Sequence, residues 1–503
     1  MKLEGGFIQN LGRVYAIYTL GFLGFVVLMA ILSSAGVSDK AIGWMFVGFT
    51  IAIYALIGVL SRTMESNQYY VAGREVPAVY NGMATAADWM SGASFIAMAG
   101  GIYLNGYPYM AFLVGWTGGY VLVASLLAPY LRKFGCYTVP DFIGTRYGGN
   151  LARLCAVIIL VVASFTYVTA QITGTGIVAS RALAIPFNVG VWVGLAGILF
   201  CSMLGGMRAV TWTQVAQYIV LIIAYLIPVF WMSNKLGYGL IPHIAQFDAV
   251  SRIQELEALH KVGELAPVAG VKGLAALKTG VNDAADTLMA KWKFFTLVLC
   301  MMLGTASLPH VLMRYFTTAS VKAARQSVGW SLVFICLLYL TAPALATFTK
   351  LSLLDPNLAT GIIGKPIADA QALPWVQNWS AVNFLKIVDG NGDGLLQINE
   401  FFMKGDIVVL ATPEIAGLPY VISGLVAAGG LAAAMSTADG LLLAIANALS
   451  HDLYYKIIDP KADTKTRLLV ARALLVAVGA AGAYVAAQGL TGILGAVAWA
   501  FCF

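Results

Sequence analysis

The feature that most restricts the fold of this chain is a series of uninterrupted apolar runs. About 20 apolar residues suffice for a membrane-spanning helix. Twelve such runs lie near residues 14–35, 41–61, 79–103, 108–131, 153–180, 188–206, 212–233, 292–314, 327–349, 417–450, 467–488 and 491–503, and the end of the sequence cuts the last one short. Because the runs are continuous rather than alternating, they exclude an outer-membrane barrel. We therefore predict an all-α polytopic membrane protein with a truncated last helix.

Composition supports this class and excludes others. Charged residues make up 11% of the chain and the mean hydropathy is +0.83, whereas soluble domains are about a quarter charged. This excludes a soluble multidomain enzyme, a disordered chain and a coiled coil. A membrane-embedded enzyme is disfavoured because the four histidines show no metal-ligand spacing and no nucleophile motif is present. Two of them, His310 and His451, are predicted at cytoplasmic helix ends, as interface or capping residues.

Basic residues in the short loops predict the orientation. One set of alternate loops holds only Lys40 and Arg181. The other set holds fifteen: Lys2, Arg13, Arg62, Arg74, Arg132, Lys133, Arg146, Arg208, Arg314, Lys322, Arg325, Lys456, Lys461, Lys465 and Arg467. The positive-inside rule then places the N-terminus in the cytoplasm and the long loops 235–291 and 350–416 outside. Basic residues so placed set orientation and do not indicate nucleic-acid binding. We expect a multi-pass protein of the cell membrane, in a prokaryote.

The spans from residue 79 onward divide into two halves of five. Residues 1–78 supply two N-terminal helices and a linker, 79–234 the first half, 235–291 an outer loop, and 292–503 the incomplete second half with the outer insert 350–416. An odd number of spans per half gives inverted topology. Small residues occur at matching places in the first helix of each half, at Ser91–Ser94 and Gly304–Ser307. A matched pair favours two discontinuous helices, and close helix packing is the alternative.

Two acids, Asp88 and Asp439, lie deep within apolar spans and each needs a partner, a proton or a water-lined cavity. Asp88 precedes the first proposed break, where unwound carbonyls would be free to bind a cation. Before Asp439, residues Ala433, Ser436 and Thr437 share one helix face. Two hydroxyls and a carbonyl suit a hard cation such as Na⁺. The alternative is that these hydroxyls bond back to their own helix.

Four motifs resemble those of the sodium:solute symporter family, in the family's order and over nearly the whole chain. They are Tyr69–Arg74 leading into Ala87–Phe95, Thr138–Phe142 with Arg146–Gly148, Gly205–Gln214, and Ala432–Asp439. The run Asp88–Phe95 and the run Leu308–Phe316 are most similar to the acetate/monocarboxylate permease branch. The resemblance implies a LeuT-like five-plus-five inverted repeat preceded by extra N-terminal helices.

The resemblance also implies a function and a set of site residues. The chain is expected to couple Na⁺ entry to uptake of acetate or another short monocarboxylate by alternating access. The sodium ligands would be the carbonyls of Ala87, Met90 and Ala433 and the hydroxyls of Ser436 and Thr437. Substrate would lie at the midplane beside Asp88, Ser91, Ser94, Thr305 and Ser307, with Asp439 nearby. No arginine or lysine within the membrane offers itself as a counter-ion, so the anionic substrate rests on helix dipoles and on the resemblance.

Other readings of the same scaffold stay open. The solute could be proline, a sugar or another organic acid. A sensor that keeps the symporter fold and carries a signalling domain beyond residue 503 is a rival from another class. The expected partners are a small-molecule solute, the lipid bilayer and, as an option, a small membrane subunit.

The second outer loop contains a match to the twelve-residue calcium loop of EF-hands, at 389–400. The ligand positions are Asp389, Asn391, Asp393, Leu395, Gln397 and Glu400, and Gly394 permits the sharp turn. We expect a helix on each side, at Val382–Val388 and Glu400–Lys404. The prediction is a weak structural Ca²⁺ site on the outer face, and a solvated acidic turn is the alternative.

Overall fold

The computed structural model describes residues 6–203, 205–260, 265, 268, 275–276, 288–489 and 492–502. Within these ranges, nine helical segments are long and apolar enough to cross a membrane: Leu11–Ser34, Asp39–Leu60, Tyr107–Phe134, Asn150–Leu183, Gly206–Lys235, Leu288–Ala306, Val321–Leu354, Tyr420–Ile458 and Thr464–Ala487. Two shorter apolar segments, Ala93–Asn105 and Phe187–Ser202, accompany them. The prediction of an all-helical polytopic membrane protein is therefore confirmed at this level, and its orientation stays a prediction.

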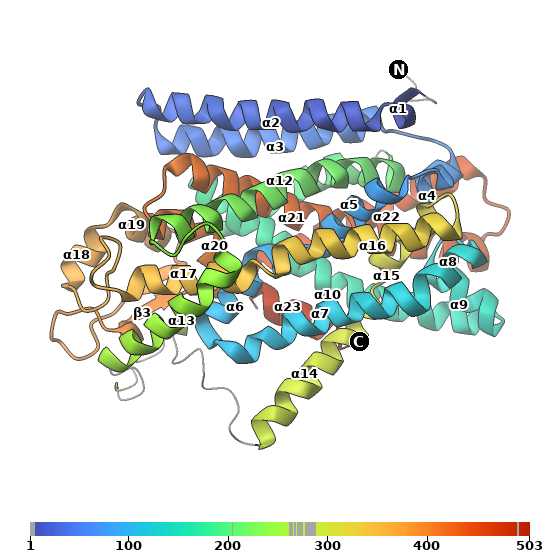
Figure 1. Ribbon diagram of the computed structural model, residues 1–503. Helices are drawn as coiled ribbons and strands as arrows, with labels where there is room; N and C mark the ends of the chain where they lie inside the picture. The colour runs from blue at the N-terminus through green and yellow to red at the C-terminus, as the bar shows by residue number, and fades with distance from the viewer. Residues whose placement is uncertain are drawn as a thin grey trace.

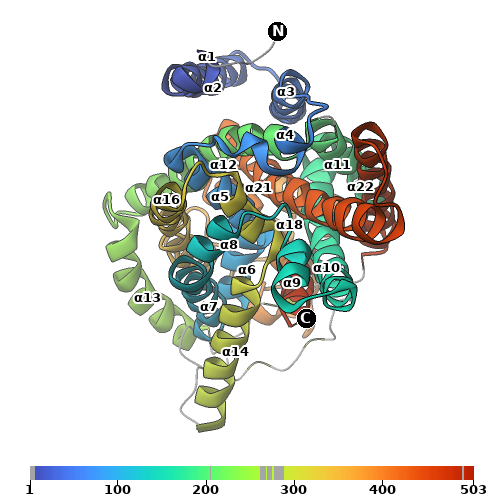
Figure 2. The same ribbon diagram turned by 90° about the vertical axis from the view of Figure 1, so that its right-hand side faces the viewer.

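A long central helix, α21 (Tyr420–Asn447), is buried along nearly its whole length and organises the bundle. It packs against α10 (Asn150–Leu183), α12 (Gly206–Lys235) and α3 (Asp39–Leu60). Viewed end-on, α5 (Ala78–Trp89) and α21 lie inside a ring of other helices (Figure 2). The N-terminal pair α2 (Leu11–Ser34) and α3 lies along one side of the bundle (Figure 1). Because α21 is apolar all round, it is stable only with neighbours on every side.

The remaining helices complete the bundle and its ends. They are α1 (Gly6–Gln9), α4 (Ser66–Val71), η1 (Ala72–Arg74), η3 (Tyr107–Tyr109), α7 (Met110–Leu122), η4 (Val123–Leu127), α8 (Ala128–Phe134), α9 (Val139–Tyr147), α11 (Phe187–Ser202), α16 (Val321–Tyr339), α17 (Ala342–Leu354), η8 (Ala448–Ile458), α22 (Thr464–Ala487) and α23 (Ile493–Ala500). Polar caps fix some of the starts. The hydroxyl of Ser320 accepts the N–H of Ala323 before α16, at 3.1 Å.

Both expected helix interruptions are present. α5 ends at Trp89, and after a short non-helical stretch the chain continues as the π-helical turn η2 (Ala93–Ala97) and α6 (Met98–Asn105). In the second half, α14 (Leu288–Ala306) stops before Ser307 and α15 (Pro309–Leu312) follows, leading into η5 (Met313–Thr317). Proline at a first helical position suits this restart, because its missing N–H would have no helical partner there.

The two long loops carry more structure than the sequence indicated. Helix α13 (Pro242–Leu259) lies in the first, and α18 (Ile367–Ala372), α19 (Pro374–Ala381), η6 (Ile398–Glu400), η7 (Gly405–Ile407) and α20 (Val408–Ile415) lie in the second. Strands β1 (Ala275–Ala276), β2 (Leu385–Ile387) and β3 (Phe401–Met403) form a small antiparallel sheet in the order β1-β3-β2. Figure 1 shows α18, α19 and β3 gathered at one end of the bundle and α9 at the other.

One local prediction about these loops was wrong. Strands β2 and β3, rather than helices, flank the loop 389–400. The reason is visible in the alternation of Leu385, Lys386 and Ile387, which turns the two apolar side chains inward and the lysine outward. In register, Leu385 pairs with Met403 and Ile387 with Phe401. The loop is thus the tip of a hairpin and not the centre of an EF-hand.

Candidate cation and solute sites

Where α5 ends, the carbonyls of Ala87 and Asp88 do not receive the backbone N–H groups that a continuing helix would supply. The N–H that would reach Asp88 belongs to Gly92, and it donates instead to Oε1 of Gln171 at 2.7 Å. The N–H of Ser91, which would reach Ala87, donates two residues back at 2.8 Å. Carbonyls at a helix C-terminus carry partial negative charge and need other partners. The break therefore presents oxygens that attract a cation.

Helix α21 brings two hydroxyls to these carbonyls. Oγ of Ser436 lies 2.7 Å from the carbonyl oxygen of Ala87 and 2.9 Å from that of Ala433. Oγ1 of Thr437 lies 2.7 Å from the carbonyl oxygen of Asp88 and 3.4 Å from that of Ala433. All five residues are buried. The hydroxyls therefore bond both to their own helix and across to the break, and five oxygens gather between α5 and α21.

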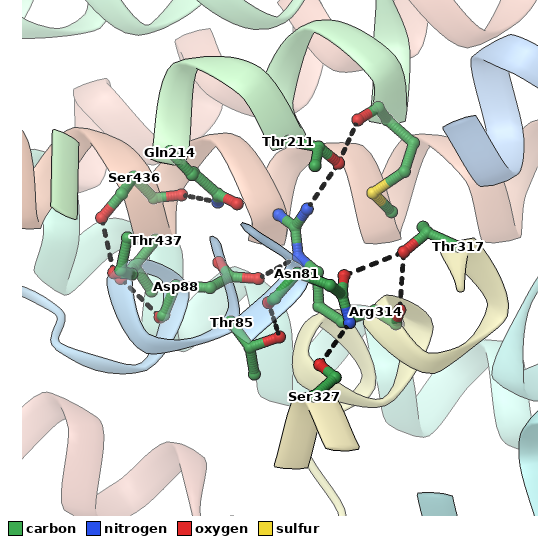
Figure 3. A network of polar contacts seen from close by, with 12 residues as sticks. Asn81, Thr85, Asp88, Thr211, Gln214, Arg314, Thr317, Ser327, Ser436 and Thr437 are labelled. Carbon is green, nitrogen blue, oxygen red and sulfur yellow. Dashed lines mark hydrogen bonds and ion pairs between the residues drawn. The ribbon is translucent and has the colours of Figure 1, made fainter. Parts of the chain in front are cut away.

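Four of the five predicted sodium ligands lie in this group, and the carbonyl of Asp88 joins them. Met90 is buried beside them, but within the described residues it makes no hydrogen bond to the group. Gln214 on α12 contacts α21 at the same place, because its Nε2 donates to the carbonyl of Ser436 at 2.7 Å. Figure 3 shows Ser436, Thr437 and Gln214 converging on the end of α5.

The carboxylate of Asp88 turns away from this group and pairs with Arg314. Nε of Arg314 lies 3.0 Å from Oδ2 of Asp88, and both side chains are fully buried. Nη1 of the same arginine donates to the hydroxyl of Thr211 at 3.1 Å (Figure 3). The expectation that Arg314 lies in a loop and that no buried basic residue exists was wrong, because η5 folds back into the bundle beside α5. The ion pair of Asp88 and Arg314 thus joins α5 to η5, which follows the second interruption.

Asp439, the other intramembrane acid, is also fully buried on α21. Neither of its carboxylate oxygens has a hydrogen-bond partner in the described part of the chain. A buried carboxylate without a partner is costly. Asp439 is therefore stable there as the neutral acid or beside a cation.

A small closed cavity lies between the two helix interruptions. Its walls are mostly aromatic and come from seven helical elements, the link between α14 and α15 and the segment after α23: Trp89, Ser94, Trp116, Tyr167, Thr305, Leu308, His310, Tyr339 and Phe501. Ring contacts hold the walls in place. Tyr167 packs edge-on against His310 with centroids 5.6 Å apart and against Phe501 at 5.4 Å. This cavity is the candidate solute site.

Of the residues predicted to contact the solute, only some line the candidate cavity. Ser94 and Thr305 line the cavity. Ser91 lies just behind its wall, where its Oγ accepts the hydroxyl of Tyr167 at 2.9 Å. Asp88 is not among the lining residues. Ser307 is exposed, and its hydroxyl lies 2.9 Å from the carbonyl of Gly304 in the last turn of α14.

The histidine assignment needs correction as well. His310 was expected at a helix end as an interface residue, but it lines the cavity and is 1% exposed. The restart of the chain at Pro309 carries it inward. His451 lies in a buried cluster instead, with Nε2 3.6 Å from a carboxylate oxygen of Asp141 and Nδ1 3.1 Å from Nη2 of Arg467.

The calcium-type loop 389–400 closes on itself. Glu400 is buried, and its two carboxylate oxygens accept the N–H groups of Gly390 at 2.7 Å and Gln397 at 2.9 Å. Oδ1 of Asp389 accepts the N–H of Gly392 at 2.7 Å. The other predicted ligands, Asn391, Asp393 and Leu395, are exposed around this turn. Glu400, the last residue of the loop, therefore lies beside its first residues.

One group in this loop has a perturbed pKa. Hydrogen bonds from the N–H of Leu395 and then from Asn391 lower the pKa of the Asp393 carboxyl. Asp393 is therefore ionised at neutral pH, and its two oxygens accept hydrogen bonds from Leu395, Asn391 and Gln397.

Comparisons with known proteins identify the family and the fold of this chain. The model of the sodium:solute symporter family matches residues 69–366 and 407–502. An uncharacterized symporter of Cupriavidus necator is 43% identical, over 96% of this chain and 82% of its own length. A monocarboxylic acid transporter of Corynebacterium glutamicum is 28% identical, over 86% of this chain and 70% of its own. Among solved structures, a Na⁺-coupled sialic acid symporter in a substrate-bound outward-open state shares the fold, with a TM-score of 0.63 at 16% identity over 89% of this chain and 82% of that one.

Proposed function

This chain belongs to the sodium:solute symporter family and is a secondary symporter rather than an enzyme, and we propose that it couples inward movement of Na⁺ to the uptake of a short monocarboxylate. The observation that carries the proposal is the contact of the Ser436 and Thr437 hydroxyls on α21 with the carbonyls of Ala87 and Asp88 at the end of α5. Hard oxygens from two different helices suit a hard cation.

Sodium would enter this group as a transported ion. Lying among the hydroxyl and carbonyl oxygens, it would hold α5 against α21 more strongly than the two hydrogen bonds do alone. Each charge moved inward across 100 mV supplies about 2.3 kcal/mol. Release of the ion on the cytoplasmic side would loosen the same contact and let the bundle change conformation.

Alternating access would act through the interrupted helices. We infer that the segments α5–α12 and α14–α23 form the two inverted halves, because each begins with an interrupted helix. The buried pair of Asp88 and Arg314 would keep the two breaks in register during the transition. The cavity between them is closed in this conformation.

The substrate class rests on two supports. The Corynebacterium glutamicum relative is a monocarboxylic acid transporter by name, although it is only 28% identical. The candidate cavity has room for about one water molecule in this conformation, so any solute requires it to widen and a short solute requires the least widening. Acetate is the simplest such solute.

The proposal is tested with purified protein reconstituted in liposomes. Uptake of radiolabelled acetate, L-proline and D-glucose would be measured with an inward Na⁺ gradient and with K⁺ replacing Na⁺. We expect acetate uptake that requires Na⁺. Acetate uptake that is equal in K⁺ medium would contradict sodium coupling, and Na⁺-driven uptake of proline or glucose in place of acetate would contradict the substrate class.

We further propose that the loop 389–400 binds Ca²⁺ as a structural site on the outer face. The closing of Glu400 over the start of the loop supports this, together with the ionised Asp393. Because the loop connects β2 to β3, an ion there would brace the insert that leads through α20 into α21.

A further inference from the structure

Several polar atoms on residues that line the candidate cavity have no hydrogen-bond partner in the described part of the chain. They are the indole Nε1 of Trp89 and of Trp116, Oγ1 of Thr305, and both ring nitrogens of His310. The four residues are between 1% and 5% exposed. Buried polar groups nearly always have a hydrogen-bond partner. Four such residues around one cavity therefore indicate a ligand that supplies the missing partners.

The chemistry of these atoms defines the ligand. An indole N–H can only donate, a neutral imidazole donates once, and a hydroxyl can donate as well as accept. The remaining polar groups of the wall are already paired, since Oγ of Ser94 lies 2.9 Å from the hydroxyl of Tyr339 and Tyr167 donates to Ser91. The cavity thus offers an excess of donors. A carboxylate only accepts, so it fits this set.

The lining also disfavours the other solute classes. No acid and no second base lines the cavity among the described residues. The ammonium group of an amino acid would find no carboxylate there. Among the unpartnered groups, only Thr305 and one nitrogen of His310 could accept from the many hydroxyls of a sugar. Without a charged wall residue, the nearby Na⁺ supplies the opposite charge. Trp89 is two residues from Ala87, whose carbonyl belongs to the cation site.

The size of the cavity limits the carbon chain. In this closed conformation it has room for about one water molecule. The ring of Trp116 lies 6.2 Å from that of Tyr339 and 6.1 Å from that of Phe501, centroid to centroid. Any solute therefore requires these rings to move apart, and a methyl or ethyl group requires the least movement.

We propose that His310, with the indole N–H groups of Trp89 and Trp116, binds the carboxylate of a two- or three-carbon monocarboxylate and selects it over zwitterions and sugars. This inference rests on the proposed function and assigns the substrate residues of the same site. His310 is the central member because its two nitrogens are both unpartnered, and its ring is held by Tyr167.

The test measures equilibrium binding of [¹⁴C]acetate to the full purified chain in detergent, with Na⁺ present. His310→Ala removes the imidazole, His310→Gln keeps an amide donor, and Trp116→Phe keeps the ring while removing its N–H. Losing one hydrogen bond to a charged group weakens binding by about ten- to a hundredfold. We expect that loss in His310→Ala and Trp116→Phe and a smaller one in His310→Gln. Matched controls are His243→Gln, on the outer helix α13, and Trp330→Phe, on the exposed face of α16.

Binding of ²²Na⁺ to the same samples separates the two proposals and reports folding. Normal ²²Na⁺ binding with weakened acetate binding in the cavity variants supports the assignment. Wild-type acetate affinity in both His310→Ala and Trp116→Phe overturns it, as does displacement of acetate by equimolar L-proline or D-glucose, while sodium coupling stands. Sodium-independent acetate binding by the wild type would instead count against the proposed function.

Discussion

Breaking the buried pair of Asp88 and Arg314 tests how the two interrupted helices are held together. At 3.0 Å and an effective dielectric constant near 20, the attraction between the two charges is about 5 kcal/mol. The change Asp88→Asn removes the negative charge and leaves the buried guanidinium with neutral partners alone, Thr211 and the new amide oxygen. Removing one member of a buried pair costs about 3–5 kcal/mol. We expect the free energy of unfolding to fall by about that amount.

The assay is a denaturant titration of detergent-purified protein, followed by tryptophan fluorescence. The double variant Asp88→Asn with Arg314→Gln removes the stranded charge, so it should be more stable than Asp88→Asn alone. The matched control is Glu255→Gln, which breaks the exposed pair with Arg252 at 2.8 Å and should cost less than about 1 kcal/mol. A wild-type midpoint for Asp88→Asn, or strictly additive losses in the double variant, would refute the reasoning.

Two further predictions concern a glycine and the outer loop. A Cβ at Gly440 would overlap Oδ1 of Asp88, so Gly440→Ala should destabilise the protein by about 1–3 kcal/mol. The control is Gly48→Ala, because a Cβ there has no neighbouring atom within contact distance. Equal melting midpoints for the two variants would contradict the contact between Gly440 and Asp88. At a Ca²⁺ concentration 100-fold above the dissociation constant of the loop 389–400, bound Ca²⁺ should raise the free energy of unfolding by about 2.7 kcal/mol. Glu400→Gln should abolish this stabilisation. A wild-type melting midpoint that chelation leaves unchanged would show that the loop is an acidic turn.

The sequence was most informative where backbone periodicity and small residues decide the structure. The apolar runs located the bundle helices, and the matched small segments located both breaks to within a few residues, because a helix interrupted inside an apolar run needs residues that tolerate unwinding. The pairing of Ser436 and Thr437 with the end of α5 also followed from the family resemblance. In contrast, the strands β2 and β3 were too short for their alternation to outweigh the expectation of flanking helices.

Arg314 and His310 were missed because loop and helix-end positions in a sequence do not reveal how the chain folds back. Both lie in Leu308–Phe316, a stretch that is otherwise mostly apolar. An arginine and a histidine with apolar neighbours on both sides are expensive in a membrane unless they are buried with partners. Read in that way, the run would have pointed to Asp88 as the partner of Arg314. The aromatic walls of the cavity come from elements far apart in sequence, so the residues alone could not place them together.

The central claim is that Na⁺ binds where α21 meets the break after α5, and ²²Na⁺ binding to purified protein tests it most directly. Ser436→Ala and Thr437→Ala each remove a hydroxyl from the group, while Ser423→Ala removes one from the same helix away from it. The account predicts at least about tenfold weaker Na⁺ binding in the first two and unchanged binding in the third. Wild-type Na⁺ affinity in both Ser436→Ala and Thr437→Ala would contradict it.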